Sequence, residues 1–296
     1  MNTHFTGTGV ALVTPFTSDL QVDHKALRHL VEYVIEGGVD YLVVLGTTAE
    51  SATLDKEEKK DVMRTVARAA AGRIPLVVGI GGNNTRALVE EIKTKDLQGY
   101  SAILSVSPYY NRPTQEGIYR HFKALAKAST LPLILYNVPS RTGSNVLPET
   151  AIRLAEECDN IIGIKEASGD LAQISHLLEN APEGFMVISG DDLTAVPVIL
   201  KGGAGVISVL GQGIPGVFSE MIRKARSGES EAALGLHSQL APLVEMLFRE
   251  GNPAGIKGLL KTRGIGSARV RLPLVAPSED LVRAIEDFLK NELPGR

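Results

Sequence analysis

The segment NIIGIKEASGD, residues 160–170, carries the features that decide the fold of this chain. Ile161, Ile162 and Ile164 form a short apolar run of β-branched residues, which is typical of a buried strand. Lys165 follows this run directly. A lysine in such a place either faces water or an ion pair, or loses its charge so that the neutral amine can act as a nucleophile.

Seven further runs rich in Val, Ile and Leu lie along the chain. Each is continuous rather than alternating, as expected for strands that are covered on both faces. Helical patterns separate the runs: residues 24–37 carry an amphipathic stripe behind a capping Asp23, and Asp55 with Glu58 forms a capping-box arrangement. The runs occupy residues 9–15, 41–46, 74–81, 101–108, 131–139, 185–192 and 204–209.

Eight strand signals, each followed by a helix signal, predict an α/β fold, a closed (β/α)8 barrel of the TIM type. An open doubly wound sheet is the alternative, but it usually has fewer strands and a stronger nucleotide fingerprint. After about residue 227 the strand signals mostly stop and helical patterns follow. We therefore expect a catalytic barrel over residues 1–227 and a helical C-terminal domain over residues 228–296.

Composition excludes several classes of protein. The 296 residues are 44% hydrophobic and 22% charged, with a net charge of −3, and no basic tract indicates a nucleic-acid or anionic-membrane partner. The N-terminus does not resemble a signal peptide, and the apolar runs are too short to cross a bilayer. The single cysteine, Cys158, excludes an intrachain disulfide. We expect a cytoplasmic protein.

Active sites of such barrels lie at the carboxyl ends of the strands. One amine, one guanidinium and several hydroxyls would meet there. Each has a structural alternative: an ion pair with Glu166 or another carboxylate at the rim for Lys165, a solvated rim position for Tyr136, and a surface charge for Arg141. The other lysines lie mostly on helical patterns or in loops, where a solvated charge is the default expectation.

Other chemistries fit the sequence less well. The six histidines show no metal-ligand spacing, which disfavours a zinc enzyme. GIGGNN, residues 79–84, matches a dinucleotide loop only loosely, and neither a phosphate loop nor a GxSxG elbow occurs. We therefore expect neither a metal nor a cofactor.

Six motifs, in order at the predicted strand ends, resemble the dihydrodipicolinate synthase family of the pyruvate-dependent, Schiff-base class I aldolases. The resemblance covers essentially the whole chain. The motifs are GTTAESATL (46–54), SPYYNRP (107–113), YNVPSRTG (136–143), GIKEASG (163–169), SGDD (189–192) and GGAGVISV (202–209).

The resemblance implies a lyase that condenses pyruvate with L-aspartate-4-semialdehyde to 4-hydroxy-2,3,4,5-tetrahydrodipicolinate, in diaminopimelate and lysine biosynthesis. N-acetylneuraminate lyase and the 2-keto-3-deoxy sugar acid aldolases share the lysine and a tyrosine, and they are the alternative within the enzyme class. The threonine pair and the arginine of YNVPSRTG favour the synthase branch. A non-catalytic barrel that binds a keto acid is the alternative from a different class.

The resemblance also implies catalytic roles. Lys165 would form an imine with pyruvate, and Tyr136 would shuttle protons. Thr47 and Tyr110 would complete a hydroxyl relay, with Tyr110 reaching across a tight dimer interface from a neighbouring subunit. The implied assembly is a homo-oligomer, most often a tetramer built as a dimer of dimers.

Substrate-binding residues follow from the same resemblance: Thr48 for the pyruvate carboxylate, Arg141 for that of the semialdehyde, and Gly190 and the Ile207 carbonyl lining the site. Two features depart from the family. Ala49 replaces a usual glycine, which would cost stability only where the turn needs a positive φ. Lys56, Lys59 and Ala87 stand where inhibited members carry histidines and a glutamate, so we expect weak or absent inhibition by lysine.

Overall fold

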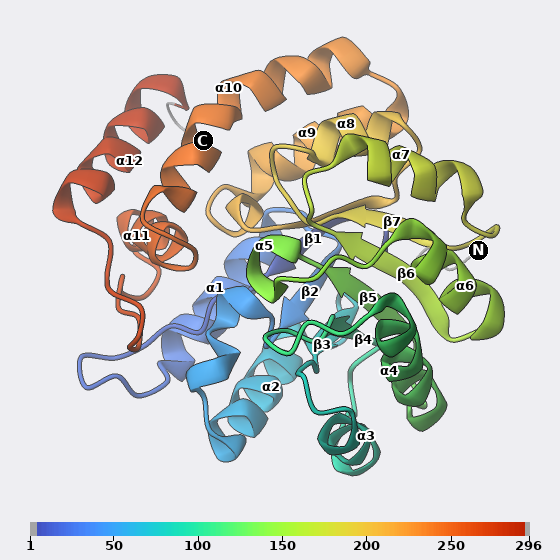
Figure 1. Ribbon diagram of the computed structural model, residues 1–296. Coiled ribbons are helices and arrows are strands. Elements are labelled where there is room, and N and C mark those ends of the chain that lie inside the picture. The colour runs from blue at the N-terminus through green and yellow to red at the C-terminus, as the bar shows by residue number, and fades with distance from the viewer. Residues whose placement is uncertain (1–4, 294–296) are drawn as a thin grey trace.

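In the computed structural model, which describes residues 5–293, eight parallel strands form a closed barrel in sequence order with helices around it (Figure 1). The predicted (β/α)8 barrel is thereby confirmed. The strands are β1 (Gly7–Ala11), β2 (Tyr41–Val44), β3 (Leu76–Gly79), β4 (Ala102–Val106), β5 (Leu133–Asn137), β6 (Ile161–Glu166), β7 (Met186–Ser189) and β8 (Gly205–Ser208).

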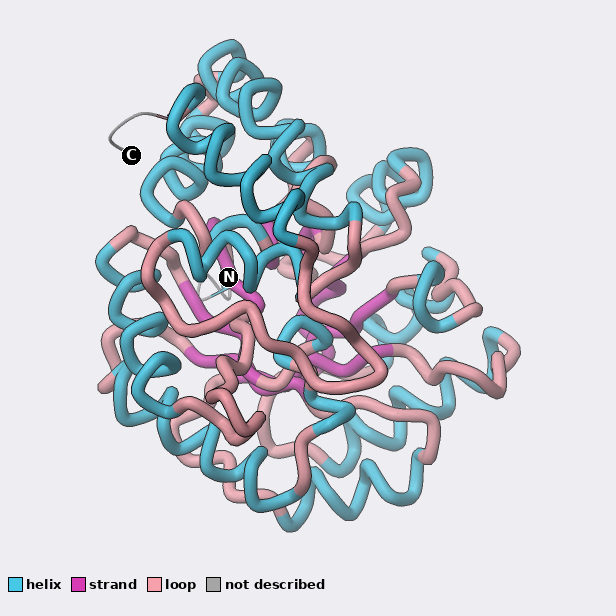
Figure 2. The backbone as a smooth tube through the Cα atoms, turned by 90° about the vertical axis from the view of Figure 1, so that its left-hand side faces the viewer, coloured by secondary structure: helices cyan, strands magenta, loops and turns pink. Residues whose placement is uncertain are grey.

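The helices cover the outside of the strands, so that the strands form the inner ring (Figure 2). Both faces of every strand are therefore shielded, which explains the continuous apolar runs. The helices of the barrel are α1 (His24–Glu36), α2 (Lys56–Ala70), α3 (Thr85–Thr94), α4 (Gln115–Ala128), α5 (Pro139–Thr142), α6 (Pro148–Glu157), α7 (Leu171–Asn180), α8 (Ala195–Leu200) and α9 (Pro215–Ser227).

Side-chain alternation on the strands decides what enters the barrel. On β5, Leu135 belongs to the large core between strands and helices, whereas Ile134 and Tyr136 belong to a second cluster inside the barrel. On β6, Ile164 packs in the outer core. Because neighbouring side chains on a strand point to opposite faces, Lys165 points inward.

Local caps place the helices as the sequence predicts. The Asp23 carboxylate accepts a hydrogen bond from the Ala26 amide at 2.9 Å and begins α1. At α2 both halves of the capping box form between Asp55 and Glu58. These caps satisfy amides that would otherwise lack partners at the first turn of a helix.

The first strand lies earlier than its apolar run. The run covers residues 9–15, but β1 ends at Ala11; the Leu12 amide still donates to the Val43 carbonyl of β2 at 3.0 Å, and the next two residues bond outside the strands. The Val13 amide donates to Gln212 Oε1 at 2.9 Å, and the Thr14 hydroxyl donates to the Ala49 carbonyl at 2.8 Å. The end of β1 is thus bonded to the turn that follows β2.

A C-terminal helical extension packs on one side of the barrel (Figures 1 and 2). It consists of α10 (Ser230–Arg249), α11 (Ala254–Thr262) and α12 (Glu279–Glu292). Leu281, Ile285 and Leu289 of α12 are buried in the same hydrophobic core as the barrel helices. The division of the chain after residue 227 remains a prediction.

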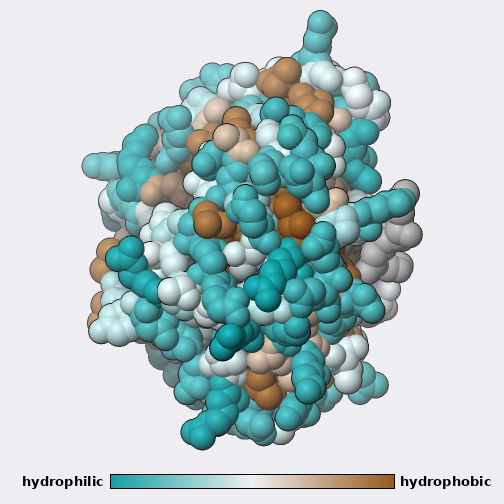
Figure 3. Space-filling view, turned by 45° about the vertical axis from the view of Figure 1, so that its right-hand side comes forward, coloured by the Kyte–Doolittle hydropathy of each residue, from teal (hydrophilic) through white to brown (hydrophobic). Residues whose placement is uncertain are grey.

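The surface is mainly hydrophilic on the face shown in Figure 3, where apolar side chains form separate patches. Among residues 5–293, no helix is both long enough and apolar enough to cross a membrane.

Candidate active site at the carboxyl end of the barrel

Lys165 and Tyr136 are neighbours at the ends of β6 and β5. The two residues are paired in the strand register, and both side chains are inside the barrel, with exposed fractions of 6% and 7%. Lys165 Nζ lies 4.4 Å from the centroid of the Tyr136 ring, within cation–π range. The strand register therefore places an amine against the face of a phenol.

Glu166 points away from this pair and does not neutralise Lys165. Its buried carboxylate accepts hydrogen bonds from the side-chain amides of Asn137 and Gln173, each at 2.9 Å, and from the Ser168 backbone at 2.7 Å. The alternative of a Lys165–Glu166 ion pair is therefore wrong. Within residues 5–293, the Lys165 ammonium has neither a hydrogen bond nor an ion pair.

Gly190 and Ile207 lie on the other side of the lysine. A Cβ atom at Gly190 would lie 2.9 Å from Lys165 Cε and 2.6 Å from the Ala167 side chain, closer than real side chains approach. A glycine is thus required if the lysine stem is to run past the end of β7. Ile207 is fully buried on β8, in the same inner cluster as Tyr136.

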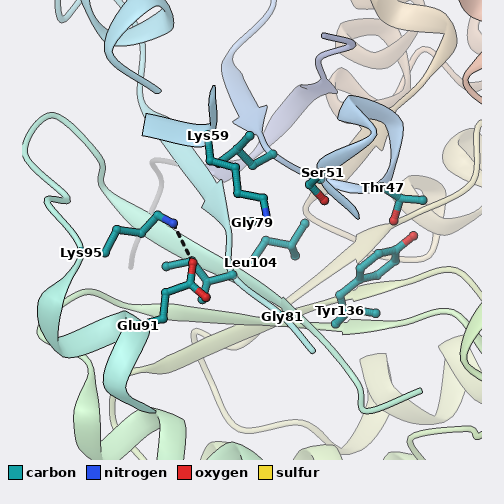
Figure 4. Close-up of a pocket in the computed structure, with 13 residues that line it drawn as sticks. Thr47, Ser51, Lys59, Gly79, Gly81, Glu91, Lys95, Leu104 and Tyr136 are labelled. Atoms are coloured by element: carbon teal, nitrogen blue, oxygen red, sulfur yellow. Dashed lines mark hydrogen bonds and ion pairs between the residues drawn. The ribbon is translucent and has the colours of Figure 1, made fainter. Parts of the chain in front are cut away.

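Thr47 and Thr48 follow β2 in a short 3-10 turn, Thr47–Ala49. Thr47 and Tyr136 line one end of a cavity of about 110 Å³, and their hydroxyls point toward one another in Figure 4. Ser51 and Lys59 line the same cavity further from the tyrosine. Thr48 is buried, and its hydroxyl accepts a hydrogen bond from the Asn252 amide nitrogen at 3.0 Å.

The left-handed residue of this turn is Glu50, with φ 54°, and not Ala49. A positive φ is uncommon outside glycine, so the conformational free-energy cost of this turn arises at Glu50. The exchange of glycine for alanine at position 49 is therefore mild. From here on, Thr47–Glu50 is called the threonine turn.

Lys257 is a second buried lysine, and it corrects the expectation that lysines on helical patterns are solvated. It lies on α11, and its ammonium contacts Glu50 Oε1 at 2.5 Å, with both side chains 1% exposed. Burial lowers the pKa of Lys257 to about 8, although the Glu50 carboxylate opposes this shift. The sequence signal was the placement of a lysine among the apolar residues of AGIKGLL, residues 254–260.

Tyr110 and Arg141 lie outside this cluster in the single chain. Tyr110 is 88% exposed and has φ 73°, so its side chain projects from the loop after β4. Arg141 is exposed on α5 at the rim of the barrel. The chain therefore brings together Lys165, Tyr136, Thr47, Thr48, Gly190 and Ile207, and leaves the other two at the edge.

Clusters of metal-binding side chains do not occur in the described residues 5–293, which contain no group of three or more His, Cys, Asp or Glu side chains able to hold an ion. The most buried histidine of residues 5–293, His121, bonds to the Thr85 hydroxyl at 2.8 Å on the outer helices. Burial lowers the pKa of His121 to about 4, which keeps its ring neutral.

The fold and the site define a (β/α)8 barrel with a lysine amine at the carboxyl ends of the strands, an arrangement that a Schiff-base aldolase requires. Residues 4–292 match the model of the dihydrodipicolinate synthetase family, and the chain belongs to this family.

Individual relatives match the chain over nearly their whole lengths. The chain is 56% identical to the 4-hydroxy-tetrahydrodipicolinate synthase of Flavobacterium psychrophilum, covering 97% of this chain and 98% of the relative. The structure of dihydrodipicolinate synthase from Thermotoga maritima superposes with a TM-score of 0.95 at 40% identity, covering 98% and 99% of the two chains. The structure of the chloride-inhibited dihydrodipicolinate synthase from Acinetobacter baumannii, complexed with pyruvate, superposes with a TM-score of 0.93 at 42% identity. The match covers 97% of this chain and 98% of that chain.

Proposed function

We propose that the protein is a lyase that condenses pyruvate with L-aspartate-4-semialdehyde to 4-hydroxy-tetrahydrodipicolinate, in lysine biosynthesis. The observation that carries the proposal is Lys165, a buried amine at the barrel mouth without a carboxylate partner among residues 5–293. The family and the names of the relatives support the choice of the synthase over the sugar-acid aldolases.

The chemistry follows from a free amine in that position. Lys165 Nζ attacks the keto carbon of pyruvate, and loss of water gives a protonated imine. The imine withdraws electrons from the methyl group, so a proton leaves and an enamine forms without a metal. The enamine carbon then attacks the aldehyde. Finally, the amino group of the semialdehyde displaces Lys165 from the imine carbon, which closes the ring and frees the enzyme.

Tyr136 and Thr47 are placed to move the protons. The Tyr136 ring packs on the lysine amine, and its hydroxyl faces Thr47 across the cavity. A tyrosine alone is a weak base at neutral pH, and a chain of hydroxyls lets each proton travel over hydrogen-bond distances. Tyr110 from a partner subunit completes this relay in the proposal.

The two substrate carboxylates are held by different groups. Thr48 and the backbone of its turn donate to pyruvate, while the planar guanidinium of Arg141 suits a bidentate contact with the semialdehyde. The exposed place of Arg141 on the rim is consistent with capture of the second substrate. Gly190 and Ile207 shape the wall beside the lysine.

The proposed assembly is a homo-oligomer, a tetramer built as a dimer of dimers in the cytoplasm. Tyr110 supports a tight dimer because a neighbouring subunit would bury an aromatic side chain that is 88% exposed in the single chain. A Tyr110 that reaches the site of its neighbour would make the dimer the smallest active unit.

Borohydride trapping tests the proposed chemistry directly. The protein is incubated with pyruvate, reduced with sodium borohydride, and analysed by intact mass and a peptide map. We expect one pyruvate-derived adduct, located on Lys165, because reduction fixes an imine at its own nitrogen. Binding of pyruvate without any adduct would contradict the Schiff-base mechanism and favour a non-catalytic keto-acid barrel.

We also predict that millimolar lysine leaves the steady-state rate unchanged. Lys59 lines the cavity beside Ser51, and Lys56, Lys59 and Ala87 line a larger groove between α2 and α3. The one carboxylate that lines both, Glu91, is already bound by Lys95 at 2.6 Å. In the cavity beside Ser51, a cationic effector therefore meets the ammonium of Lys59, while the one carboxylate among the lining residues already has a partner.

A matched variant shows whether these three positions determine the sensitivity of the enzyme to inhibition by lysine. Lys56→His, Lys59→His and Ala87→Glu together remove two ammonium groups and add a carboxylate, so this variant should gain inhibition by lysine. Inhibition of the wild-type enzyme in the same steady-state assay would overturn the prediction.

A further inference from the structure

The threonine turn is held in place by residues of the C-terminal extension. Its left-handed residue, Glu50, joins the 3-10 turn Thr47–Ala49 to a second one, Ser51–Thr53. A non-glycine residue keeps such a conformation only where its surroundings fix it. The Glu50 side chain runs away from the barrel mouth, toward α11 and the loop behind it.

The Glu50 carboxylate is held on both of its oxygens. Lys257 Nζ contacts Oε1 at 2.5 Å, and the Arg271 backbone amide donates to Oε2 at 2.8 Å. Lys257 in turn donates to the Arg269 carbonyl at 2.8 Å and lies 4.1 Å from the centroid of the Phe16 ring. A charge pair so fully buried fixes its backbone, because movement of either partner would leave an uncompensated charge.

Asn252 makes the second contact from the extension. Its Nδ2 donates to Thr48 Oγ1 at 3.0 Å, and both residues are buried. A hydroxyl that accepts this bond keeps its own proton free to donate. Within residues 5–293 the Thr48 hydroxyl has no acceptor, so its proton stays unbonded on a turn that directly follows β2 at the carboxyl end of the barrel.

We propose that Asn252 and Lys257 are positioning residues for pyruvate binding. Asn252 directs the Thr48 hydroxyl proton to the substrate carboxylate, and Lys257 fixes the threonine turn through Glu50. The proposal rests on the proposed function, because it assumes that pyruvate binds at this turn. It assigns the C-terminal extension a part in substrate binding, although the extension lies outside the ring of strands and helices that forms the barrel.

The first test compares two substitutions of one residue. Asn252→Ala removes the donor to Thr48, and we expect the pyruvate KM to rise about ten-fold. Asn252→Asp keeps the shape but offers an acceptor, so Thr48 donates to the introduced carboxylate instead of to pyruvate, and a negative charge faces the substrate. For this variant we expect the pyruvate KM to rise about 100-fold. The semialdehyde KM should change little in either variant.

A purely structural role predicts the opposite order. Aspartate is the closer isostere, so stability and KM would then suffer less in Asn252→Asp than in Asn252→Ala. An Asn252→Asp variant whose pyruvate KM equals or falls below that of Asn252→Ala would overturn the role of Asn252. Thermal unfolding of both variants separates a loss of fold from a loss of binding.

The second test removes the buried pair as a unit. Lys257→Met alone would leave the buried Glu50 carboxylate without a partner and could unfold the protein, so it is combined with Glu50→Gln, which removes the second charge of the pair. We expect the double variant to fold but to show a pyruvate KM raised about ten-fold. Lys261→Met, at an exposed position on the same helix, is the control and should behave as wild type.

The outcomes distinguish this proposal from the proposed function. A folded double variant with the wild-type pyruvate KM would overturn the role of Lys257 while leaving the synthase activity intact. A wild-type enzyme that neither turns over pyruvate nor forms the borohydride adduct would overturn the proposed function, and this proposal with it.

Discussion

The Lys165→Met variant should lose activity by about 10⁴-fold or more, since it lacks the proposed nucleophile, on which every later step of the proposed mechanism depends. Methionine is unbranched and fills nearly the same space, so packing against Tyr136 and Gly190 should survive. Removal of a buried ammonium that has no ion pair within residues 5–293 should leave the protein as stable as before or more so. Steady-state rates and thermal unfolding measure the two effects.

The same variant gives a sharp test by mass. After incubation with pyruvate and borohydride, Lys165→Met should carry no adduct, while Lys201→Met, at an exposed lysine after α8, should be labelled as in wild type. An adduct that persists in Lys165→Met would mean that another amine forms the imine. Lys257 would then be the first to examine, because burial lowers its pKa to about 8.

Tyr136→Phe should reduce kcat by about 10²- to 10³-fold, because the ring stays against the lysine while the proposed proton carrier, the phenol hydroxyl, is lost. The pyruvate adduct should still form, only more slowly, since the nucleophile is intact. Single-turnover trapping against time therefore separates the two roles. A variant that never forms the adduct would show that Tyr136 holds the lysine in place rather than moving protons.

The control for this change is a tyrosine away from the barrel mouth. Tyr119 lies on α4, where its hydroxyl bonds to Glu157 and Lys123 on the outer surface. Tyr119→Phe removes the same atom without touching the mouth, so kcat should not change. A comparable loss in Tyr119→Phe would point to general destabilisation and not to proton transfer.

The sequence was sufficient for the barrel because burial on both faces produces continuous apolar runs at regular spacing. It was also sufficient to find the lysine and the tyrosine, because each ends a strand and neighbouring parallel strands end at the same rim. The strand register pairs Tyr136 with Lys165, so the two residues are neighbours as expected. Alternation then explains why Lys165 points inward while Glu166 points outward.

The contacts around the threonine turn could not be predicted in the same way. Glu50 and Lys257 are 207 positions apart, and no local pattern links them. The periodicity of the α11 sequence predicts a helix, but it does not indicate which segment of the chain packs against that helix. The left-handed conformation of Glu50 is equally hidden, since glutamate carries no conformational signal comparable to glycine.

The buried pair between Glu50 and Lys257 also sets an order of assembly during synthesis. Strands and helices of the barrel emerge from the ribosome first and can begin to pack at once. The anchor of the threonine turn cannot form until the chain has been made as far as α11. A chain cut short between α9 and α11 would contain every strand and Lys165, but its threonine turn would lack this anchor.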